Sequence, residues 1–129
     1  MKYLTPQDIL ILHAKLVDET GGLHGVRDVG LLKSIVERPK QKLYGKSVYS
    51  SVFEKAAVYL EGLANYHIFT DGNKRTAVIV SARFLFMNGY SLDISNKELV
   101  KFVLAVVNEK PEIKVIARWL KTNSKKIKK

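Results

Sequence analysis

A chain of 129 residues with a formal charge of +10 is long enough for one ordinary domain and too short for two well-packed ones. Apolar residues make up 47% of it and charged residues 26%, a globular mix that excludes an intrinsically disordered chain. Cysteine is absent, which excludes disulfides and thiolate metal sites, and no apolar run approaches the roughly 18 residues of a transmembrane helix. We therefore expect a cytoplasmic protein that does not enter a membrane.

The first third of the chain carries clear helix signals. The run Thr-Pro-Gln-Asp at residues 5–8 predicts a helix start, with an N-cap, a proline at the first helical position and an acid in the first turn. This helix should end at Gly21-Gly22. A shorter helix should span residues 28–37, because the residue before Pro39 resists the α conformation, and residues 39–49 should form an exposed connection.

Four further helices follow. Residues 51–65 repeat apolar side chains at steps of three and four, which predicts a helix with one buried face. Residues 76–88 are apolar nearly all round, so this helix should be the buried centre of the domain. A capping box at residues 95–98 begins a fifth helix, and a sixth should follow Pro111. Because strand alternation is hard to find, the sequence predicts an all-α fold: a compact bundle of about six helices around a central buried helix.

The positive charge is concentrated at the end of the chain. Five of the 22 basic residues lie in residues 121–129, so residues 1–120 hold 17 basic and 12 acidic groups, a net charge of +5. Strongly basic chains attract nucleic acid, acidic proteins or phosphate-bearing ligands. This distribution favours a single domain, residues 1–120, followed by a solvated basic tail, residues 121–129, over a nucleic-acid-binding arm.

The segment His67-Ile68-Phe69-Thr70-Asp71-Gly72-Asn73-Lys74-Arg75 departs from ordinary helix chemistry. Lys74 and Arg75 stand in the first turn of the helix that follows, where unpaired N–H groups and a partial positive charge disfavour cations. A bound phosphate would relieve that repulsion. The misfit therefore predicts a phosphate site at this helix N-terminus.

The other residues of this loop each have a structural and a functional interpretation. Gly72 is either a turn glycine or a point of close approach to a ligand. Asp71 taken alone is more often an Asx-turn or helix-cap residue, although it could bind Mg²⁺ beside nucleotide phosphates. Asn73 is an N-cap or a polar group that fixes the loop or a phosphate oxygen. His67 is either a core histidine, because it extends the apolar stripe of the preceding helix, or a general base. We expect Phe69 to anchor the loop in the core.

Two other kinds of site are excluded by spacing. A P-loop needs a glycine five residues before Gly-Lys, and here Asn73 separates Gly72 from Lys74. A closed zinc site needs His or Cys neighbours that the loop lacks. His13 and His24 have no comparable setting, and we expect both to be structural.

The nine-residue segment resembles the signature of the Fic/Doc family, and in detail its Doc branch, whose loop reads His-x-Phe-x-Asp-Ala/Gly-Asn-Lys-Arg. Seven of the nine positions match. Gly21-Gly22-Leu23-x-Gly25 and residues 84–89 also look like Doc, so the resemblance covers nearly the whole chain and implies a Fic-like fold.

The resemblance implies a set of residue roles. His67 would be the general base that activates a Ser or Thr hydroxyl of a target protein, and Asp71 would hold Mg²⁺, with ATP as the phosphate donor. Catalysis and nucleotide binding would share the start of the next helix, where Gly72, Asn73 and Lys74 line an anion hole and Arg75 clamps a nucleotide phosphate.

Three departures from typical Fic enzymes bear on the reaction. Fic enzymes that transfer AMP have proline after the histidine, glycine at the position of Lys74 and a second arginine three residues past the first. This chain has Ile68, Lys74 and Val78 there, which favours transfer of the terminal phosphate over AMP transfer. Ile79 stands where some Doc sequences carry asparagine.

Restraint of the activity should come from another protein. The inhibitory motif Ser/Thr-x-x-x-Glu-Gly/Asn is absent, because Glu61-Gly62 is preceded by Ala57. The resemblance therefore implies a separate Phd-like antitoxin, and as target a translation factor such as elongation factor Tu, whose modification would inhibit translation. The alternatives are AMP transfer by the same fold, a non-catalytic basic nucleic-acid-binding domain, and a regulatory partner that binds nucleotide without turnover.

Overall fold

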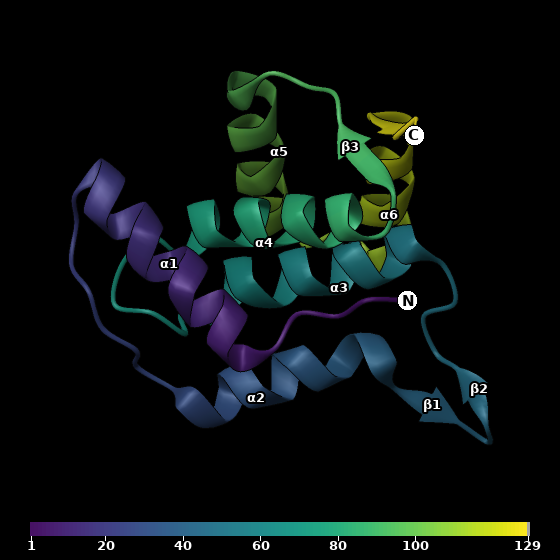
Figure 1. The fold of residues 1–129 in the computed structure, drawn as a ribbon, viewed down its shortest axis with the longest axis horizontal. Coiled ribbons are helices and arrows are strands. Elements are labelled where there is room, and N and C mark those ends of the chain that lie inside the picture. The colour runs from purple at the N-terminus through teal and green to yellow at the C-terminus, as the bar shows by residue number, and fades with distance from the viewer. Residues whose placement is uncertain (129) are drawn as a thin grey trace.

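A computed structural model describes residues 1–128 and contains, within that range, six α-helices and four short strands (Figure 1). The helices are α1 (Pro6–Thr20), α2 (Val29–Glu37), α3 (Val52–Asn65), α4 (Asn73–Met87), α5 (Asn96–Glu109) and α6 (Ile113–Thr122), with a 3-10 turn, η1 (Arg38–Lys40), after α2. This arrangement confirms the predicted all-α bundle of about six helices. None of these helices has both the length and the apolar character that crossing a bilayer requires.

Side-chain caps set the start of several helices. Thr5 and Asp8 form the predicted capping box of α1, with the Thr5 hydroxyl accepting from the Asp8 N–H at 3.1 Å and the Asp8 carboxylate accepting from the Thr5 N–H at 2.8 Å. Asp28, Ser51 and Ser95 are the N-caps of α2, α3 and α5, and the side chain of each accepts a backbone N–H of the first turn. These bounds follow from local sequence, as predicted.

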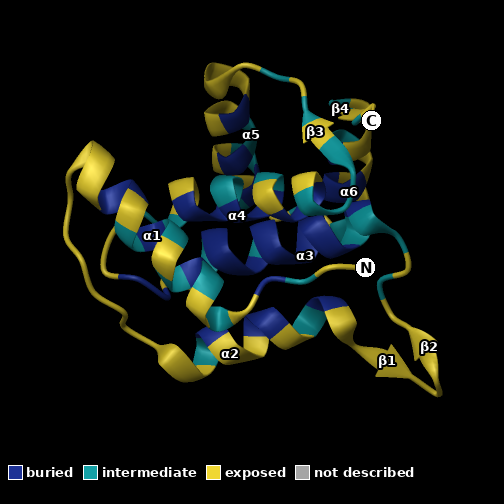
Figure 2. Cartoon of the chain, in the orientation of Figure 1, coloured by how far each residue is buried: buried dark blue, intermediate teal, exposed yellow. Residues whose placement is uncertain are grey.

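Helices α3 and α4 lie side by side at the centre of the molecule (Figure 1). The prediction gave α3 a single buried face, which is wrong: α2, α5 and α6 also pack on it, so that residues 55–60 are all buried (Figure 2). Helix α4 is less enclosed than predicted, with Phe86 56% exposed and Arg83 exposed. The two helices therefore share the central position.

The strands were missed because each has only two or three residues. Strands β1 (Lys42–Leu43) and β2 (Lys46–Ser47) form an exposed antiparallel hairpin inside the predicted connection. Strand β3 (Tyr90–Leu92) pairs antiparallel with β4 (Ser124–Lys126), and the Lys125 ammonium lies 2.7 Å from the Asp93 carboxylate. Part of the predicted basic tail therefore pairs with the domain while Lys121, Lys125, Lys126 and Lys128 stay exposed. A domain boundary at residue 120 stays a prediction.

The connection between α1 and α2 runs along the segment that follows α3. The Arg27 N–H donates to the Ile68 carbonyl at 2.7 Å, and the Thr70 N–H donates to the Gly25 carbonyl at 3.0 Å. Val26 and Phe69 form an isolated antiparallel bridge between these hydrogen bonds. This pairing brings the end of α1, the α1–α2 connection and the loop before α4 together at one end of the bundle.

Lys55 is a buried cation that ties α3 to η1. It is 4% exposed, and its ammonium donates to the Pro39 carbonyl at 2.7 Å and lies 5.6 Å from the ring centroid of Tyr3. Substitution Lys55→Met keeps the length and apolar stem but leaves the carbonyl unpaired. We expect it to lower the free energy of unfolding by about 1–3 kcal/mol, measured by urea denaturation.

The matched control for this prediction is Lys101→Met on the exposed surface of α5. That variant should stay within about 0.5 kcal/mol of the original protein. Equal losses in both variants would show that the Pro39 contact contributes nothing specific.

Candidate active site

His67 lies on the turn between α3 and the loop. Helix α3 ends at Asn65, and His67 has a left-handed backbone with φ of +30°, which costs about 1–3 kcal/mol and persists only where the surroundings impose it. The turn buries Ile68 and Phe69, at 0% and 1% exposure, and leaves His67 exposed. The core-histidine interpretation is therefore wrong, because the apolar stripe of α3 does not continue to His67. Phe69 is the buried anchor of the loop, as predicted.

The side chain of Asn73 closes the loop. Its Oδ1 accepts from the Phe69 N–H at 3.0 Å, and its Nδ2 donates to the Phe69 carbonyl at 2.9 Å. Gly72, at φ +76°, occupies the N-cap position of α4, and this left-handed conformation turns the chain into the helix. The helix-cap interpretation of Asp71 and Asn73 was therefore wrong. Asn73 instead fixes the loop, which was its alternative role.

The N-terminus of α4 has the properties of an anion site. No side chain caps it and no acid lies in its first turn, so the N–H groups of that turn have no side-chain partner and the partial positive charge of the helix remains available to an anion. Lys74 and Arg75 are exposed, and neither forms an ion pair within residues 1–128. The predicted electrostatic misfit is thus present: two cations without ion pairs stand in the first turn, and the nearby Asp71 carboxylate is bonded to the N–H of Gly72, the residue before the helix.

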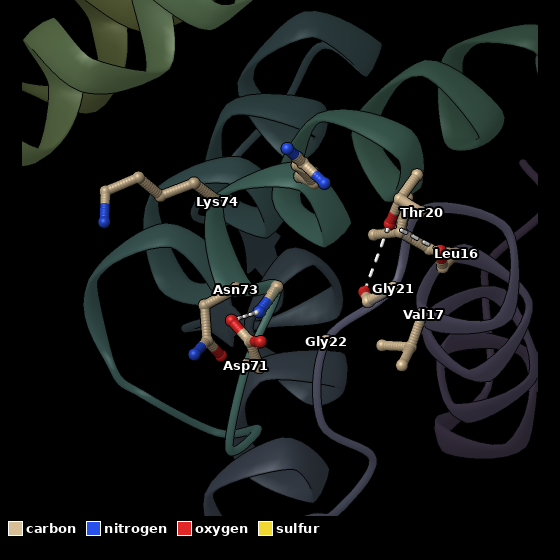
Figure 3. Close-up of a pocket in the computed structure, with 10 residues that line it drawn as sticks. Leu16, Val17, Thr20, Gly21, Gly22, Asp71, Asn73 and Lys74 are labelled. Carbon is tan, nitrogen blue, oxygen red and sulfur yellow. Dashed lines mark hydrogen bonds between the residues drawn. The ribbon is translucent and has the colours of Figure 1, made fainter.

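A cavity of about 430 Å³ opens at this helix end (Figure 3). It collects five of the six predicted site residues, which are Asp71, Gly72, Asn73, Lys74 and Arg75. The opposite wall comes from the end of α1 and the glycines after it, and Figure 3 shows Lys74 extended away from Asp71. His67 is not in the lining; it lies on the exposed surface at the other end of the loop.

A second cavity, of about 440 Å³, adjoins the first. The two share Leu16, Lys74 and Arg75, and the second is lined mainly by apolar side chains of α4 and α5, including Val78 and Ile79. A charged cavity beside an apolar one suits a ligand with an anionic chain at one end and a flat apolar group at the other.

The Asp71 carboxylate accepts two backbone N–H groups. Its Oδ1 accepts from Gly72 at 2.9 Å, and its Oδ2 accepts from Leu23 at 3.2 Å. Each oxygen retains a further lone pair. No group of three or more His, Cys, Asp or Glu that could hold a metal occurs in the described range 1–128. One carboxylate fits Mg²⁺, which completes its coordination with phosphate oxygens and water, and does not fit a metal site made by protein alone.

His13 contacts this loop, which was not predicted from the sequence. The residue is 3% exposed on α1, its Nε2 lies 2.8 Å from the Asp71 carbonyl oxygen, and its ring stacks on Phe69. The available signal was its position between the buried Ile9 and Leu16, because a polar group on an apolar helix face needs a partner. His24, by contrast, is exposed.

Gly22, next to Leu23 in the α1–α2 connection, leaves no room for a side chain beside Asp71. A Cβ at Gly22 would lie 2.6 Å from Asp71 Oδ2, whereas one at Gly21 would have no atom within 4 Å; both glycines have positive φ, +108° and +82°. Alanine strains the backbone at either position, but only Gly22→Ala displaces the carboxylate.

We expect Gly22→Ala to shift the amide resonance of Gly72 in ¹H–¹⁵N NMR spectra and Gly21→Ala to leave it in place. Identical Gly72 resonances in the two variants would contradict this contact.

Comparison with known proteins agrees with this geometry. The model of the Fic/DOC family matches residues 3–85, which include the loop and the α1 wall of the cavity. Toxin Doc from Mycolicibacterium smegmatis is 41% identical over 91 residues, 70% of this chain and 68% of that protein. Protein kinase doc from Escherichia phage P1 is 29% identical over 121 residues, 94% of each chain. The chain therefore belongs to the Fic/Doc family, and within it to the Doc branch that its loop resembles.

Proposed function

We propose that this protein is the toxin of a toxin–antitoxin pair and that it transfers the terminal phosphate of a nucleoside triphosphate to a Ser or Thr hydroxyl of a target protein. The observation that carries the proposal is the uncapped N-terminus of α4, where Lys74 and Arg75 share a cavity with Asp71. A polyphosphate complements that charge. The names of the two relatives, Toxin Doc and Protein kinase doc, support the toxin and kinase parts of the proposal.

In the proposed reaction His67 is the general base. Its exposed imidazole takes the proton of the target hydroxyl as the hydroxyl oxygen attacks the terminal phosphorus. The new P–O bond forms while the bond to the bridging oxygen breaks, and the nucleoside diphosphate leaves with that electron pair. The N–H groups at the start of α4, together with Lys74 and Arg75, stabilise the negative charge on the transferred group and the leaving group.

Asp71 would hold Mg²⁺ together with the phosphates of ATP. When bound, the metal supplies positive charge that lowers the repulsion between the phosphates and the attacking oxygen. The residues of the chain orient the carboxylate: the N–H groups of Leu23 and Gly72 hold its two oxygens from different sides. The carboxylate is therefore aimed before any ligand enters.

Transfer of the terminal phosphate is favoured over transfer of AMP. The cations of the site are concentrated at the first turn of α4, while Val78, one turn further, lines the apolar second cavity. An arginine at the position of Val78 would clamp a further phosphate deeper in the site. Without it, the strongest anion contacts fall near Lys74 and Arg75, where the reacting phosphate would lie.

The proposed partners are a Phd-like antitoxin, which would supply the restraint that the chain lacks, and a cytoplasmic translation factor such as elongation factor Tu as the target. Phosphorylation of that factor would inhibit translation. We do not propose direct binding of nucleic acid, because five of the 22 basic residues lie in residues 121–129 and the rest of the chain has a net charge of only +5.

The test of the base is His67→Asn, since asparagine tolerates a left-handed backbone better than most residues and cannot accept the proton. We expect transfer of γ-labelled phosphate from ATP to elongation factor Tu, or to a protein in a cell lysate, to fall by about 100-fold or more, because general-base catalysis contributes about 10²–10⁴. The melting temperature should change little, since the side chain is exposed.

The matched control is His24→Asn, which alters an exposed histidine outside both cavities. It should retain the full rate. A normal rate in His67→Asn would exclude His67 as the base, and label reaching the target only from the α-phosphate would replace phosphate transfer by AMP transfer.

The role of Arg75 is tested by nucleotide binding. Substitution Arg75→Gln removes a charge-assisted hydrogen-bond donor, worth about 1.5–3 kcal/mol, so the affinity for ATP with Mg²⁺ should fall by about 10–100-fold in isothermal titration calorimetry. Arg83→Gln, also on α4 but outside both cavities, is the control and should bind normally. Equal affinities for the two variants would contradict a phosphate clamp at Arg75.

A further inference from the structure

We propose that His13 is a positioning residue: its ring N–H holds the Asp71 carbonyl and thereby sets the geometry of the segment from Asp71 to Arg75. The proposal rests on the proposed function for its catalytic consequence, but its structural part can be tested without activity. His13 belongs to α1, far from the loop in sequence, and touches the loop through one polar contact and one stacking contact.

The polar contact has only one possible direction. The His13 Nε2 and the Asp71 carbonyl oxygen are 2.8 Å apart. A carbonyl can only accept, so the nitrogen donates and the proton must be on Nε2. The imidazole is 3% exposed, so water has little access to compete for the carbonyl. The bond therefore defines both the ring tautomer and the direction in which the carbonyl points.

The stacking contact joins His13 to the closure of the loop. Its ring lies parallel to that of Phe69, with centroids 3.7 Å apart and an interplanar angle of 8°. The backbone N–H and carbonyl of Phe69 are both bonded by the Asn73 side chain. His13 thus contacts the loop at Phe69 and at Asp71, on either side of its turn.

The position of the Asp71 carbonyl controls the groups proposed to act on phosphate. The Asp71 carboxylate is on the same residue, and Gly72, the N-cap of α4, follows at once. A Cβ built at Gly72 would lie 3.8 Å from both His13 Nε2 and Leu16 Cδ2, so His13 also stands beside the N-cap of α4. Movement of the carbonyl would rotate the peptide that leads into α4 and shift both the carboxylate and the first N–H groups of the helix. A misplacement of about 1 Å can cost about 100-fold in rate.

A packing role alone is a poor explanation for a histidine at this position. The neighbouring buried residues of α1 are Ile9, Leu16 and Val17, and an apolar side chain would fill the same face without burying polar atoms. The hydrogen bond to Asp71 is what an apolar residue cannot supply. This distinction provides the test.

The test compares two substitutions that separate the ring from the donor. His13→Phe keeps a flat apolar ring against Phe69 and loses the donor, whereas His13→Gln keeps an N–H donor at similar reach and loses the ring. For phosphate transfer from ATP, we expect kcat of His13→Phe to fall by about 10–100-fold with KM for ATP within about threefold. His13→Gln should retain kcat within about fivefold, even if its melting temperature is lower. A packing role predicts the reverse order, with phenylalanine the better substitute.

A second readout does not depend on activity. In ¹H–¹⁵N NMR spectra of the full chain, the amide resonances of Gly72 and Asn73 should move in His13→Phe and stay close to their original positions in His13→Gln, and long-range ¹⁵N spectra should show His13 protonated at Nε2. The proposal would be overturned if His13→Phe left both the amide resonances and kcat unchanged. It would also be overturned if His13 were protonated only at Nδ1. If the original protein transfers no phosphate but the NMR pattern holds, the proposed function fails and the positioning of the loop by His13 stands.

Discussion

The two hydrogen bonds between the Asn73 amide and the backbone of Phe69 are the constraint on which the site depends. They join the first residue of α4 to the buried anchor of the loop, so the loop cannot open without pulling Phe69 out of the core. Because Phe69 is also stacked on His13, the packing of α1 against α4 determines where the first N–H groups of α4 point. A buried aromatic ring thus sets the geometry of an exposed anion site.

Features that depend on a few adjacent residues could be predicted from the sequence. Capping at Thr5 and Ser95 requires only a short polar side chain before an apolar helical repeat, and the structure has both caps. The cationic first turn of α4 was equally local, because its misfit with the helix charge can be recognised wherever a helix is expected to begin. The grouping of residues 71–75 around one cavity follows from that adjacency.

Features that depend on contacts between distant segments could not be predicted. The Asp71 carboxylate binds Leu23, 48 residues away, and its carbonyl binds His13, 58 residues away. Helical periodicity also failed at His67, since extending the stripe of α3 assumes helical backbone and the chain instead turns to a positive φ there. Local sequence indicated the residues gathered at the start of α4, and tertiary packing decides how Asp71 and the loop before that helix are held.

The groups of the site divide into those held by the fold and those that remain free to move. The Asp71 carboxylate and the Asn73 amide are each bonded to backbone, and the N–H groups of α4 are fixed by the helix itself. Lys74 and Arg75 have exposed side chains that make no ion pair within residues 1–128.

A phosphate chain entering the cavity would therefore meet a preorganised carboxylate and helix end, and only the two cations would lose conformational entropy on binding it. Those same cations are repelled by the helix N-terminus while no phosphate is bound, so phosphate binding would relieve the repulsion as it orders them. The local conflict that marks the segment in the sequence is thus also the physical basis on which a phosphate site is proposed there.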